Sequence, residues 1–418
     1  IGNRSGYANT TGGNNVFLGY YAGYSNNASN NVFLGYECGR YNSSGTTNTF
    51  LGYQAGRSNT TGSSNIFIGN QAGYANNASN NVFLGYLAGR YTTSGGNNTF
   101  LGTQSGYLNT TGDKNIFIGY QCGYSNTTSW GNFAAGDQAL YSIKTGTYNV
   151  AIGLTALYSN VSSNDNVAIG TSALKNCTAW YNVAIGRQAM YNASTGYGNV
   201  GVGWCALRGN YTGYYNTAIG YAANTTISGV QNTTAIGYSA ANTASNQVRI
   251  GNSSVSSIGG YAGWSNLSDG RFKVEAKSSV PGLDFILKLR PATYYLNIDK
   301  LSSFLNIPDS LRVMELEAEK AKMLQTGFIA QEVEEAAKSI NYDFSGIDKP
   351  KNEKDHYSLR YAEFTVPLVK AVQELHQRNQ ELQSQIEGQN DVISKLEADN
   401  DQIRAELEAL KALLTKGN

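Results

Sequence analysis

Short, mostly apolar triplets recur along the first 250 residues of the chain, each followed by Gly and, in thirteen cases from Asn15 to Asn216, preceded by Asn. The motif reads Asn-x-[Phe/Ala]-[Leu/Ile]-Gly, as in NVFLG, NIFIG and NVAIG. Its glycines lie 16 or 17 residues apart until a last step of 14, which gives fifteen repeats. We call each repeat a rung and number the rungs 1 to 15 by the motif glycines: Gly19, Gly35, Gly52, Gly69, Gly85, Gly102, Gly119, Gly136, Gly153, Gly170, Gly186, Gly203, Gly220, Gly237 and Gly251.

This period predicts a mainly β rod over residues 1–258. A rung is too short for two helices but suits two short strands and two turns, which clusters of Asn, Gly, Ser and Thr supply. Alternation within each triplet predicts that residues such as Val16 and Leu18 point inward. One rung has too few apolar groups for a core, so we expect the rungs to stack as a parallel β-roll. At about 4.8 Å per rung the rod would be roughly 70 Å long.

The phenylalanines of the first rungs indicate that the rod associates with copies of itself. On a thin roll, Phe17, Phe33, Phe50 and Phe67 would form an exposed apolar stripe. Burying this stripe against the same stripe of other copies is the simplest solution. We therefore expect a homotrimer, the state that is consistent with the family resemblance given below.

The fifth residue after the motif glycine is Tyr or Arg in rungs 1 to 7. Stacking would bring these residues into one column, for which two interpretations stay open. The column is a surface that binds a cell-surface glycan or protein receptor, since tyrosine offers a ring and a hydroxyl. Alternatively it is a structural ladder of stacked rings and cation–π pairs. Its members are Tyr24, Arg40, Arg57, Tyr74, Arg90, Tyr107 and Tyr124.

Apolar residues return every three or four positions at the end of the chain, from Leu368 to Leu414. Such a seam, kept for more than six heptads, predicts a coiled coil over 368–416. Asn379, Gln389 and Asn400 interrupt the seam, and polar seam residues of this kind fix the register between helices. A trimeric coil is the choice that agrees with a trimeric rod.

Charge divides the chain near Trp264. The net charge is +1 overall, but residues 1–264 hold 14 of the 59 charged side chains and the remaining 154 residues hold 45. This step indicates a domain boundary. Neither a basic surface for nucleic acid nor an apolar run long enough for membrane insertion is present in the sequence.

The four cysteines, Cys38, Cys122, Cys177 and Cys205, show no paired spacing typical of zinc sites. Cys38 and Cys122 occupy a position otherwise held by Ala or Ser, which favours small buried residues. They are five rungs apart, about 24 Å along the rod, so a disulfide between them within one chain is excluded. We expect no metal and no cofactor.

Four motifs follow the boundary, within 268–375: SDGRFK (268–273), LKLRPATYYL (287–296), GFIAQEVEEAAK (327–338) and YSLRYAEFTVPLVKAVQEL (357–375). Together they resemble the self-cleaving intramolecular chaperone domain of phage endosialidases and tail fibres. The resemblance implies an α+β chaperone domain over 268–367, preceded by a linker with the cleavage site at 259–267. It also implies that Ser268 attacks the Leu267–Ser268 bond with Lys273 as its base, supported by Asp269 and Arg271.

The rod itself resembles the head repeats of trimeric autotransporter adhesins, most closely in the NVAIG rungs at 149–153, 166–170 and 182–186. The resemblance implies a left-handed parallel β-roll in a trimer. The Phe-Leu-Gly rungs 1 to 7 depart from the adhesin pattern.

These observations predict a trimeric fibre or adhesin tip on a particle or outside the cell, whose C-terminal domain assembles the trimer and then cuts itself off. An alternative is a structural spacer with a permanent trimeric cap that is not cleaved. A third is a glycan-degrading fibre enzyme. The rod has no His, and its acids Glu37, Asp113, Asp137 and Asp165 lie on separate rungs, so no carboxylate pair for glycoside hydrolysis is suggested.

Overall fold

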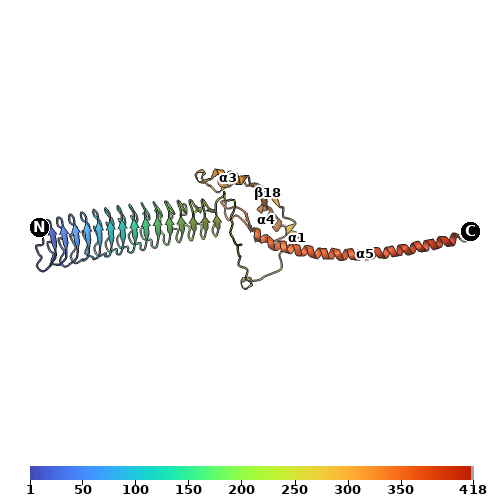
Figure 1. Ribbon diagram of the computed structural model, residues 1–418, viewed down its shortest axis with the longest axis horizontal. Helices are drawn as coiled ribbons and strands as arrows, with labels where there is room; N and C mark the ends of the chain where they lie inside the picture. The colour runs from blue at the N-terminus through green and yellow to red at the C-terminus, as the bar shows by residue number, and fades with distance from the viewer. Residues whose placement is uncertain (416–418) are drawn as a thin grey trace. The chain divides into compact units, whose positions relative to one another are not determined.

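The computed structural model describes residues 1–415, which form two compact units. One unit contains Ile1–Gly259 together with the segment Asn297–Ala321, and the other contains Gly260–Leu296 and the chain from Lys322 onward. Figure 1 traces the elements from the stacked rungs at the N-terminus to the long helix at the C-terminus.

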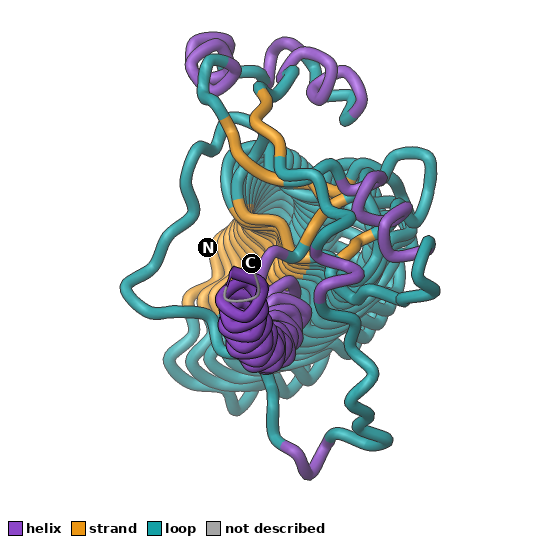
Figure 2. The backbone as a smooth tube through the Cα atoms, turned by 90° about the vertical axis from the view of Figure 1, so that its right-hand side faces the viewer, coloured by secondary structure: helices purple, strands orange, loops and turns teal. Residues whose placement is uncertain are grey.

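The rungs stack through one fifteen-stranded parallel sheet, which confirms the repeat rod. Equivalent motif positions pair between neighbouring rungs, for example Phe17 with Phe33. The strands lie along one side of the rod, whereas turns make up its other sides (Figure 2). They are β1 (Val16–Leu18), β2 (Val32–Leu34), β3 (Thr49–Leu51), β4 (Ile66–Ile68), β5 (Val82–Leu84), β6 (Thr99–Leu101), β7 (Ile116–Ile118), β8 (Phe133–Ala135), β9 (Val150–Ile152), β10 (Val167–Ile169), β11 (Val183–Ile185), β12 (Val200–Val202), β13 (Thr217–Ile219), β15 (Thr234–Ile236) and β17 (Val248–Ile250).

The expectation of two strands per rung is wrong for most of the rod. A second strand occurs only as β14 (Asn224–Thr225) paired with β16 (Ala241–Asn242). In earlier rungs the segment after the motif glycine has left-handed residues, such as Tyr21 (φ 55°) and Gly23 (φ 59°), which cannot continue an extended strand. The backbone still bonds to the next rung, since Gly23 N–H donates to Cys38 O at 2.9 Å.

The prediction of the inward residues is also wrong. Val16 is 54% and Leu18 46% exposed, whereas the middle residue of the triplet is buried, as at Phe33. The asparagine two positions earlier, Asn31, is buried as well. Because side chains alternate along a strand, an inward Asn and an inward Phe leave the two flanking positions outside. The exposed apolar stripe therefore consists of Val, Leu and Ile side chains, not of phenylalanines.

The interior changes composition at rung 8 while the fold continues. In rungs 1 to 7 the phenylalanine rings stack on one another, with 4.7 Å between the centroids of Phe50 and Phe67. From rung 8 to rung 12 the ring is replaced by Ala or Gly, and the glycine six residues later is replaced by Leu or Met, as in Ala151 and Leu157. The two exchanges compensate in volume, which is the kind of core change that proteins tolerate best.

A ladder of buried asparagines holds each rung to the next. Asn31 Oδ1 accepts from Asn48 N–H at 2.9 Å, and Asn31 Nδ2 donates to Gly45 O at 2.9 Å. One side chain thus satisfies a backbone donor of the next rung and a backbone acceptor of the turn, both of which would be costly if buried without a partner. This role explains why Asn recurs four residues before the glycine.

The cysteines are free and buried, which confirms the interpretation as small interior residues. Burial raises the pKa of the Cys122 thiol to about 12 and that of Cys177 to about 11. Both thiols are therefore protonated at neutral pH.

The region after the rod has mixed helices and strands around a core of Phe285, Val333, Ala336, Ala337, Phe344 and Phe364, as an α+β domain requires. Strands pair as β18 with β19 and as β20 with β21. The excursion between β18 and β19 belongs to the unit of the rod, where Lys320 Nζ donates to Val255 O at 2.6 Å. The elements are η1 (Gly270–Phe272), α1 (Leu283–Ile286), β18 (Ala292–Tyr294), α2 (Ile298–Phe304), η2 (Asp309–Leu311), α3 (Met314–Ala321), β19 (Gln325–Gly327), α4 (Ala330–Lys338), β20 (Ile347–Asp348), β21 (Ser358–Leu359), η3 (Tyr361–Phe364) and α5 (Thr365–Thr415).

Helix α5 contains the predicted seam, and it begins at Thr365, three residues before the predicted start. Position 416, the predicted end, lies outside the described residues. Along one chain the seam is open to solvent, with Leu382 54% and Leu396 56% exposed, as in a helix whose coiled-coil partners are other chains. None of the helices within residues 1–415 has the length and apolar character that crossing a membrane requires.

Candidate functional site

The predicted cleavage site lies in a tight turn over residues 268–273, the first of the four sequence motifs. Asp269 caps the short helix η1, and its Oδ1 accepts from Arg271 N–H at 2.9 Å. The turn closes where Phe272 N–H donates to Asp269 O and Lys273 N–H donates to Gly270 O. This reversal brings a residue five positions after Ser268 back towards it.

Ser268 and Lys273, the predicted nucleophile and base, are in contact. Lys273 Nζ lies 2.8 Å from Ser268 Oγ, within the range in which a base can take a hydroxyl proton. A neutral lysine amine in this place would accept the proton and so activate the oxygen. The two residues that the family resemblance assigns as nucleophile and base are thus brought together, and their roles stay a prediction.

The two supporting residues, Asp269 and Arg271, bind each other. The guanidinium contacts the carboxylate through Nε and Nη2, the latter at 2.6 Å from Oδ2. Hydrogen bonds from Arg271 hold the pKa of Asp269 below its usual range. Within one chain the site thus consists of two adjacent pairs, and the charge of Arg271 is balanced by Asp269 instead of being directed at Lys273.

All four site residues, except the half-buried Asp269, are exposed, and Leu267 on the other side of the scissile bond is 80% exposed. A lysine becomes an effective base when it is desolvated, because burial disfavours its charged form. One chain holds the reacting groups in place but leaves them in water.

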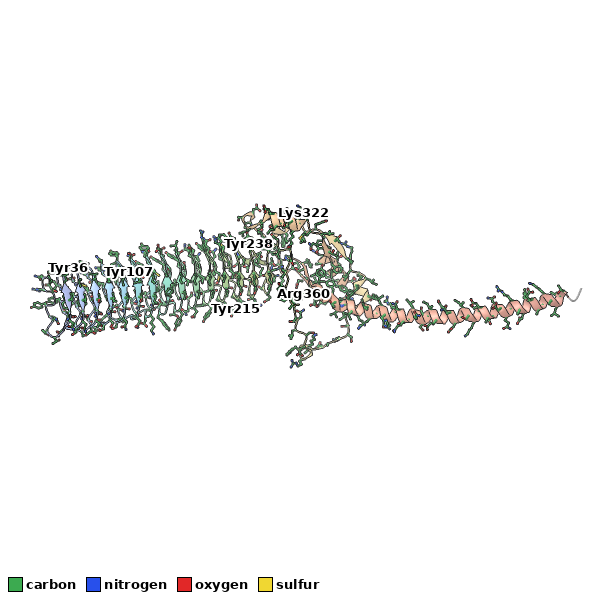
Figure 3. The ribbon with its side chains drawn as sticks, viewed as in Figure 1. Tyr36, Tyr107, Tyr215, Tyr238, Lys322 and Arg360 are labelled. Carbon is green, nitrogen blue, oxygen red and sulfur yellow. The ribbon has the colours of Figure 1, made fainter. Side chains whose placement is uncertain are left out.

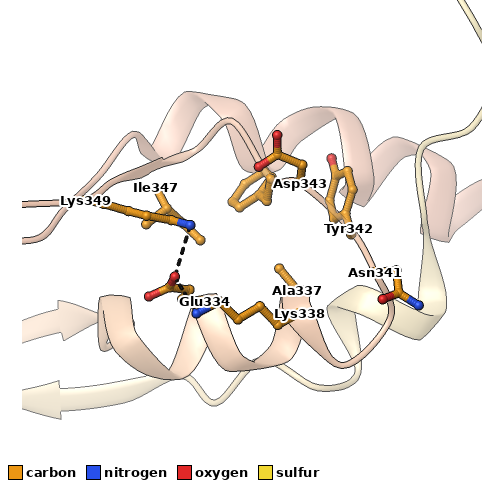
Figure 4. A pocket seen from close by; sticks show the side chains of 9 residues that line it. Glu334, Ala337, Lys338, Asn341, Tyr342, Asp343, Ile347 and Lys349 are labelled. Atoms are coloured by element: carbon orange, nitrogen blue, oxygen red, sulfur yellow. Dashed lines mark ion pairs between the residues drawn. The ribbon is translucent and has the colours of Figure 1, made fainter.

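A separate cavity of about 310 Å³ lies beside helix α4 (Figure 4). Its charged wall is centred on Glu334, which pairs with Lys338 at 2.7 Å and with Lys349 at 3.0 Å. Tyr357 adds a hydrogen bond from its hydroxyl at 2.8 Å. Hydrogen bonds from Lys338, Lys349 and Tyr357 lower the pKa of Glu334 to about 2, so this carboxylate stays ionised and ties α4 to the chain after it.

The Tyr/Arg column of the rod exists as a continuous series of contacts, and its residue Tyr107 is labelled in Figure 3. The rings of Tyr107 and Tyr124 stack with centroids 5.0 Å apart. Arg57 Cζ lies 4.9 Å from the ring centroid of Tyr41 and 5.7 Å from that of Tyr74. Its residues are half-buried, and both the binding role and the ladder role remain interpretations of the same geometry.

Sequence reasoning missed two features of this column. It continues to the same position of other rungs, which counting five residues from each glycine would have found: Tyr7, Tyr141, Tyr158, Lys175, Tyr191 and Arg208. It also missed that Glu37, 6% exposed, bonds Arg40 and Arg57 and accepts from Gln54 Nε2 at 2.8 Å. Burial opposes the ionisation of Glu37, but these bonds outweigh it and lower its pKa.

Among residues 1–415, no group of three or more His, Cys, Asp and Glu side chains is placed to hold a metal ion.

Comparison with known families singles out the same region. Residues 268–341 match the chaperone of endosialidase family. The match begins at Ser268 and continues through α4, so three of the four sequence motifs lie within it, whereas the fourth, at 357–375, lies beyond it. No curated protein and no solved structure matches the chain. We refer to residues 268–364, which contain the match and the rest of the core around Phe285, as the chaperone region.

Proposed function

We propose that the chain is a subunit of a trimeric fibre, displayed on a virion, a similar particle or a cell surface, whose chaperone region assembles the rod and then cuts itself off before Ser268. The observation that carries this proposal is the 2.8 Å contact between Lys273 Nζ and Ser268 Oγ at the first residue of the chaperone match. A nucleophile and a base at this boundary would separate the matched domain from the rod.

The chemistry is an attack of Ser268 Oγ on the carbonyl carbon of Leu267, while Lys273 takes the hydroxyl proton. The bond from Leu267 C to Ser268 N breaks, and the departing nitrogen receives the proton from Lys273. The product is an ester between Leu267 and Ser268 Oγ. Water then hydrolyses this ester, which leaves a carboxylate on Leu267 and restores the serine hydroxyl.

Trimerisation supplies what one chain leaves incomplete. The outward stripe of the strands, with Leu51 and Ile219 each 44% exposed, and the seam of α5 are both uncovered in a single copy. Association of three copies along the rod and the coil would bury both. It would also bring neighbouring chains to the join, where removal of water would favour transfer of the Ser268 hydroxyl proton to Lys273.

Register explains why such a rod needs a helper. Each rung resembles the next, so copies displaced by a whole rung would make nearly the same contacts. The chaperone region is not repetitive and therefore specifies one register. Once it has been cut off, the assembled rod cannot return along the same path, which makes the product kinetically stable.

The test is a refolding time course of the full chain, followed on denaturing gels and by mass spectrometry. We expect a fragment that ends at Leu267 in the wild type and none in Ser268→Ala or Lys273→Ala. Ser265→Ala and Lys277→Ala, which change the same residue types nearby, should cleave normally. Cleavage after Leu267 in Ser268→Ala would refute the serine mechanism.

The second candidate is a fibre spacer that keeps its cap. Two features favour it. Ser268 and Lys273 are exposed to water, and the charge of Arg271 is balanced by Asp269. The lysine therefore lacks both the desolvation and the neighbouring free cation that make such a side chain an effective base. An intact wild-type chain in a fully assembled trimer would support this candidate. Glycan hydrolysis by the rod is not supported, since Glu37 is bound by Arg40 and Arg57.

A further inference from the structure

The corner of the rung before the buried asparagine changes character at rung 8. This corner comprises the sixth and fifth residues before the motif glycine. In rungs 1 to 7 it holds only Gly, Ser, Thr, Asn, Asp and Lys, from Gly13–Asn14 to Asp113–Lys114. In rungs 8 to 13, seven of the twelve positions are aromatic. We call these seven residues the aromatic edge: Trp130, Tyr148, Trp180, Tyr181, Tyr197, Tyr214 and Tyr215.

Five residues of the aromatic edge are exposed, whereas Tyr197 and Tyr214 are half-buried. Tyr181 is 64%, Tyr215 60% and Trp180 48% exposed, and Tyr215 is labelled on the edge of the rod opposite to that of Tyr238 (Figure 3). In the Tyr/Arg column most rings are half-buried and stacked, as Tyr197 and Tyr214 of the edge also are, with centroids 5.1 Å apart. The five exposed rings of the edge therefore offer more of their surface to a ligand than the rings of the column do.

The rings of the aromatic edge are supported from beneath. The centroids of Trp130 and Tyr148 lie 4.5 Å apart, and the ring of Tyr215 lies 5.4 Å from those of Tyr197 and Tyr214. A Cβ on Gly198 would lie 2.9 Å from Cδ1 of Tyr215, so the glycine of the preceding rung makes room for the ring. Gly131 does the same for Tyr148 at 3.1 Å. Rings held in this way lose little freedom when a ligand binds.

The fold does not require aromatic residues at this corner. Tyr148, Tyr181 and Tyr215 have φ of 56°, 61° and 57°, the left-handed conformation that bulky residues rarely adopt. The same corner is formed in earlier rungs by small or polar residues such as Asn30 and Ser64. The fold imposes this conformation in early and late rungs alike, so the avoidable feature is a bulky residue in it. Strain of this kind is typical of functional sites.

The chemistry of the edge fits a sugar. Rung 10 places Asn164 and the exposed Asp165 between the aromatic pairs of rungs 8–9 and the aromatic group of rungs 11–13. Tyr and Trp rings stack on apolar faces and also hydrogen-bond, and a carboxylate accepts bonds from hydroxyls. The twelve corner positions contain no aliphatic side chain, which a hydrophobic protein partner would require, and no basic side chain, which an acidic glycan would require.

We propose that the aromatic edge of rungs 8 to 13 binds a neutral oligosaccharide along the rod. Five rung intervals span about 24 Å, so the ligand contacts the edge through several sugar units. The site lies wholly before Leu267, so the proposal holds whether or not the chain cuts itself.

The test uses the full chain with cellohexaose, maltohexaose and laminarihexaose, and with a sialic acid polymer as the acidic comparison. Binding is followed by calorimetry and by tryptophan fluorescence, to which Trp130 and Trp180 contribute from the edge. We expect at least one neutral hexaose to bind. Its affinity should fall roughly tenfold or more in the double variant Trp180→Ala/Tyr181→Ala and several-fold in Tyr215→Ala. Tyr86→Ala, at an exposed tyrosine of rung 5 that belongs neither to the aromatic edge nor to the Tyr/Arg column, is the control and should bind like the wild type.

Three results would overturn the proposal. The first is unchanged binding by the edge variants, and the second is binding of the acidic polymer alone or of no probe at millimolar concentration. The third is a smaller assembly of the double variant in light scattering, which would assign the edge to contacts between copies. Circular dichroism of each variant checks that the rod has folded.

Discussion

The ring of Phe50 lies so close to Gly56 that a Cβ built on this glycine would be 2.5 Å from Cε2 of the ring. Gly56 also has φ of 56°, like Leu157 at the same position of rung 9 with φ of 50°. The conformation therefore accepts a leucine, and the ring alone excludes it. The interior of the rod thus has two interchangeable fillings, a large residue on the strand with glycine opposite or a small residue on the strand with leucine opposite.

The first prediction follows from this exchange. Phe50→Ala should lower the free energy of unfolding by about 3–5 kcal/mol through the cavity it leaves. Gly56→Leu should cost at least about 1–3 kcal/mol through overpacking. The double variant recreates the filling of rung 9 and should be more stable than the sum of the single losses implies. Denaturant unfolding of the three variants measures the coupling, and additive losses would contradict the interpretation.

The second prediction concerns the asparagine ladder. Asn98 Oδ1 accepts from Asn115 N–H at 2.9 Å, and Asn98 Nδ2 donates to Gly112 O at 2.8 Å. Asn98→Ala leaves both backbone groups buried without these partners, at about 1–3 kcal/mol for each group. We expect a marked fall in the melting temperature of the rod. Asn70→Ala, at an exposed position, is the matched control and should change it little.

The repeats and the seam were predictable because both are periodic, and stacking or supercoiling follows from the period itself. The inward face was assigned wrongly because alternation alone leaves two choices. The recurring Asn was the missing clue, since an amide so regular must bond within the stack and so marks the inner side. The turns after the glycine were missed because Leu140 and Leu157 adopt a left-handed conformation that their side chains do not suggest.

Part of the candidate site, too, was expected before the structure was known and part was not. The pairing of Ser268 with Lys273 was expected from the family resemblance, and the structure brings the two side chains into contact through a short turn. The pairing of Arg271 with Asp269 was not expected, because it depends on the geometry of the turn. The aromatic edge was missed because its residues are spread over five of the rungs 8 to 13 and share only their distance from the glycine.

The third prediction is a pH dependence centred on Glu334. Its pKa in the folded protein is about 2, below the ordinary value of 4.5, because Lys338, Lys349 and Tyr357 hydrogen-bond its carboxylate. The stabilisation is therefore complete above pH 4.5 and is lost as the pH falls towards 2. Hydrogen exchange of α4 should show this loss. Glu334→Gln should weaken protection at neutral pH and flatten the acid dependence, whereas Glu335→Gln should behave as the wild type does.

The last prediction is that cleavage before Ser268 depends on assembly of the coiled coil. Leu382 and Ile386 lie on the exposed seam of α5, far along the chain from Ser268. Replacing both with Asp would place like charges in the seam and prevent the helices from associating. If cleavage requires neighbouring chains to exclude water from Lys273, this variant should remain intact although Ser268 and Lys273 are unchanged. Gln383→Asp/Ser384→Asp adds the same charges outside the seam and should assemble and cleave. Light scattering and denaturing gels on the same samples compare assembly with cleavage. A monomeric variant that cleaves at the wild-type rate would show that one chain suffices to activate the serine.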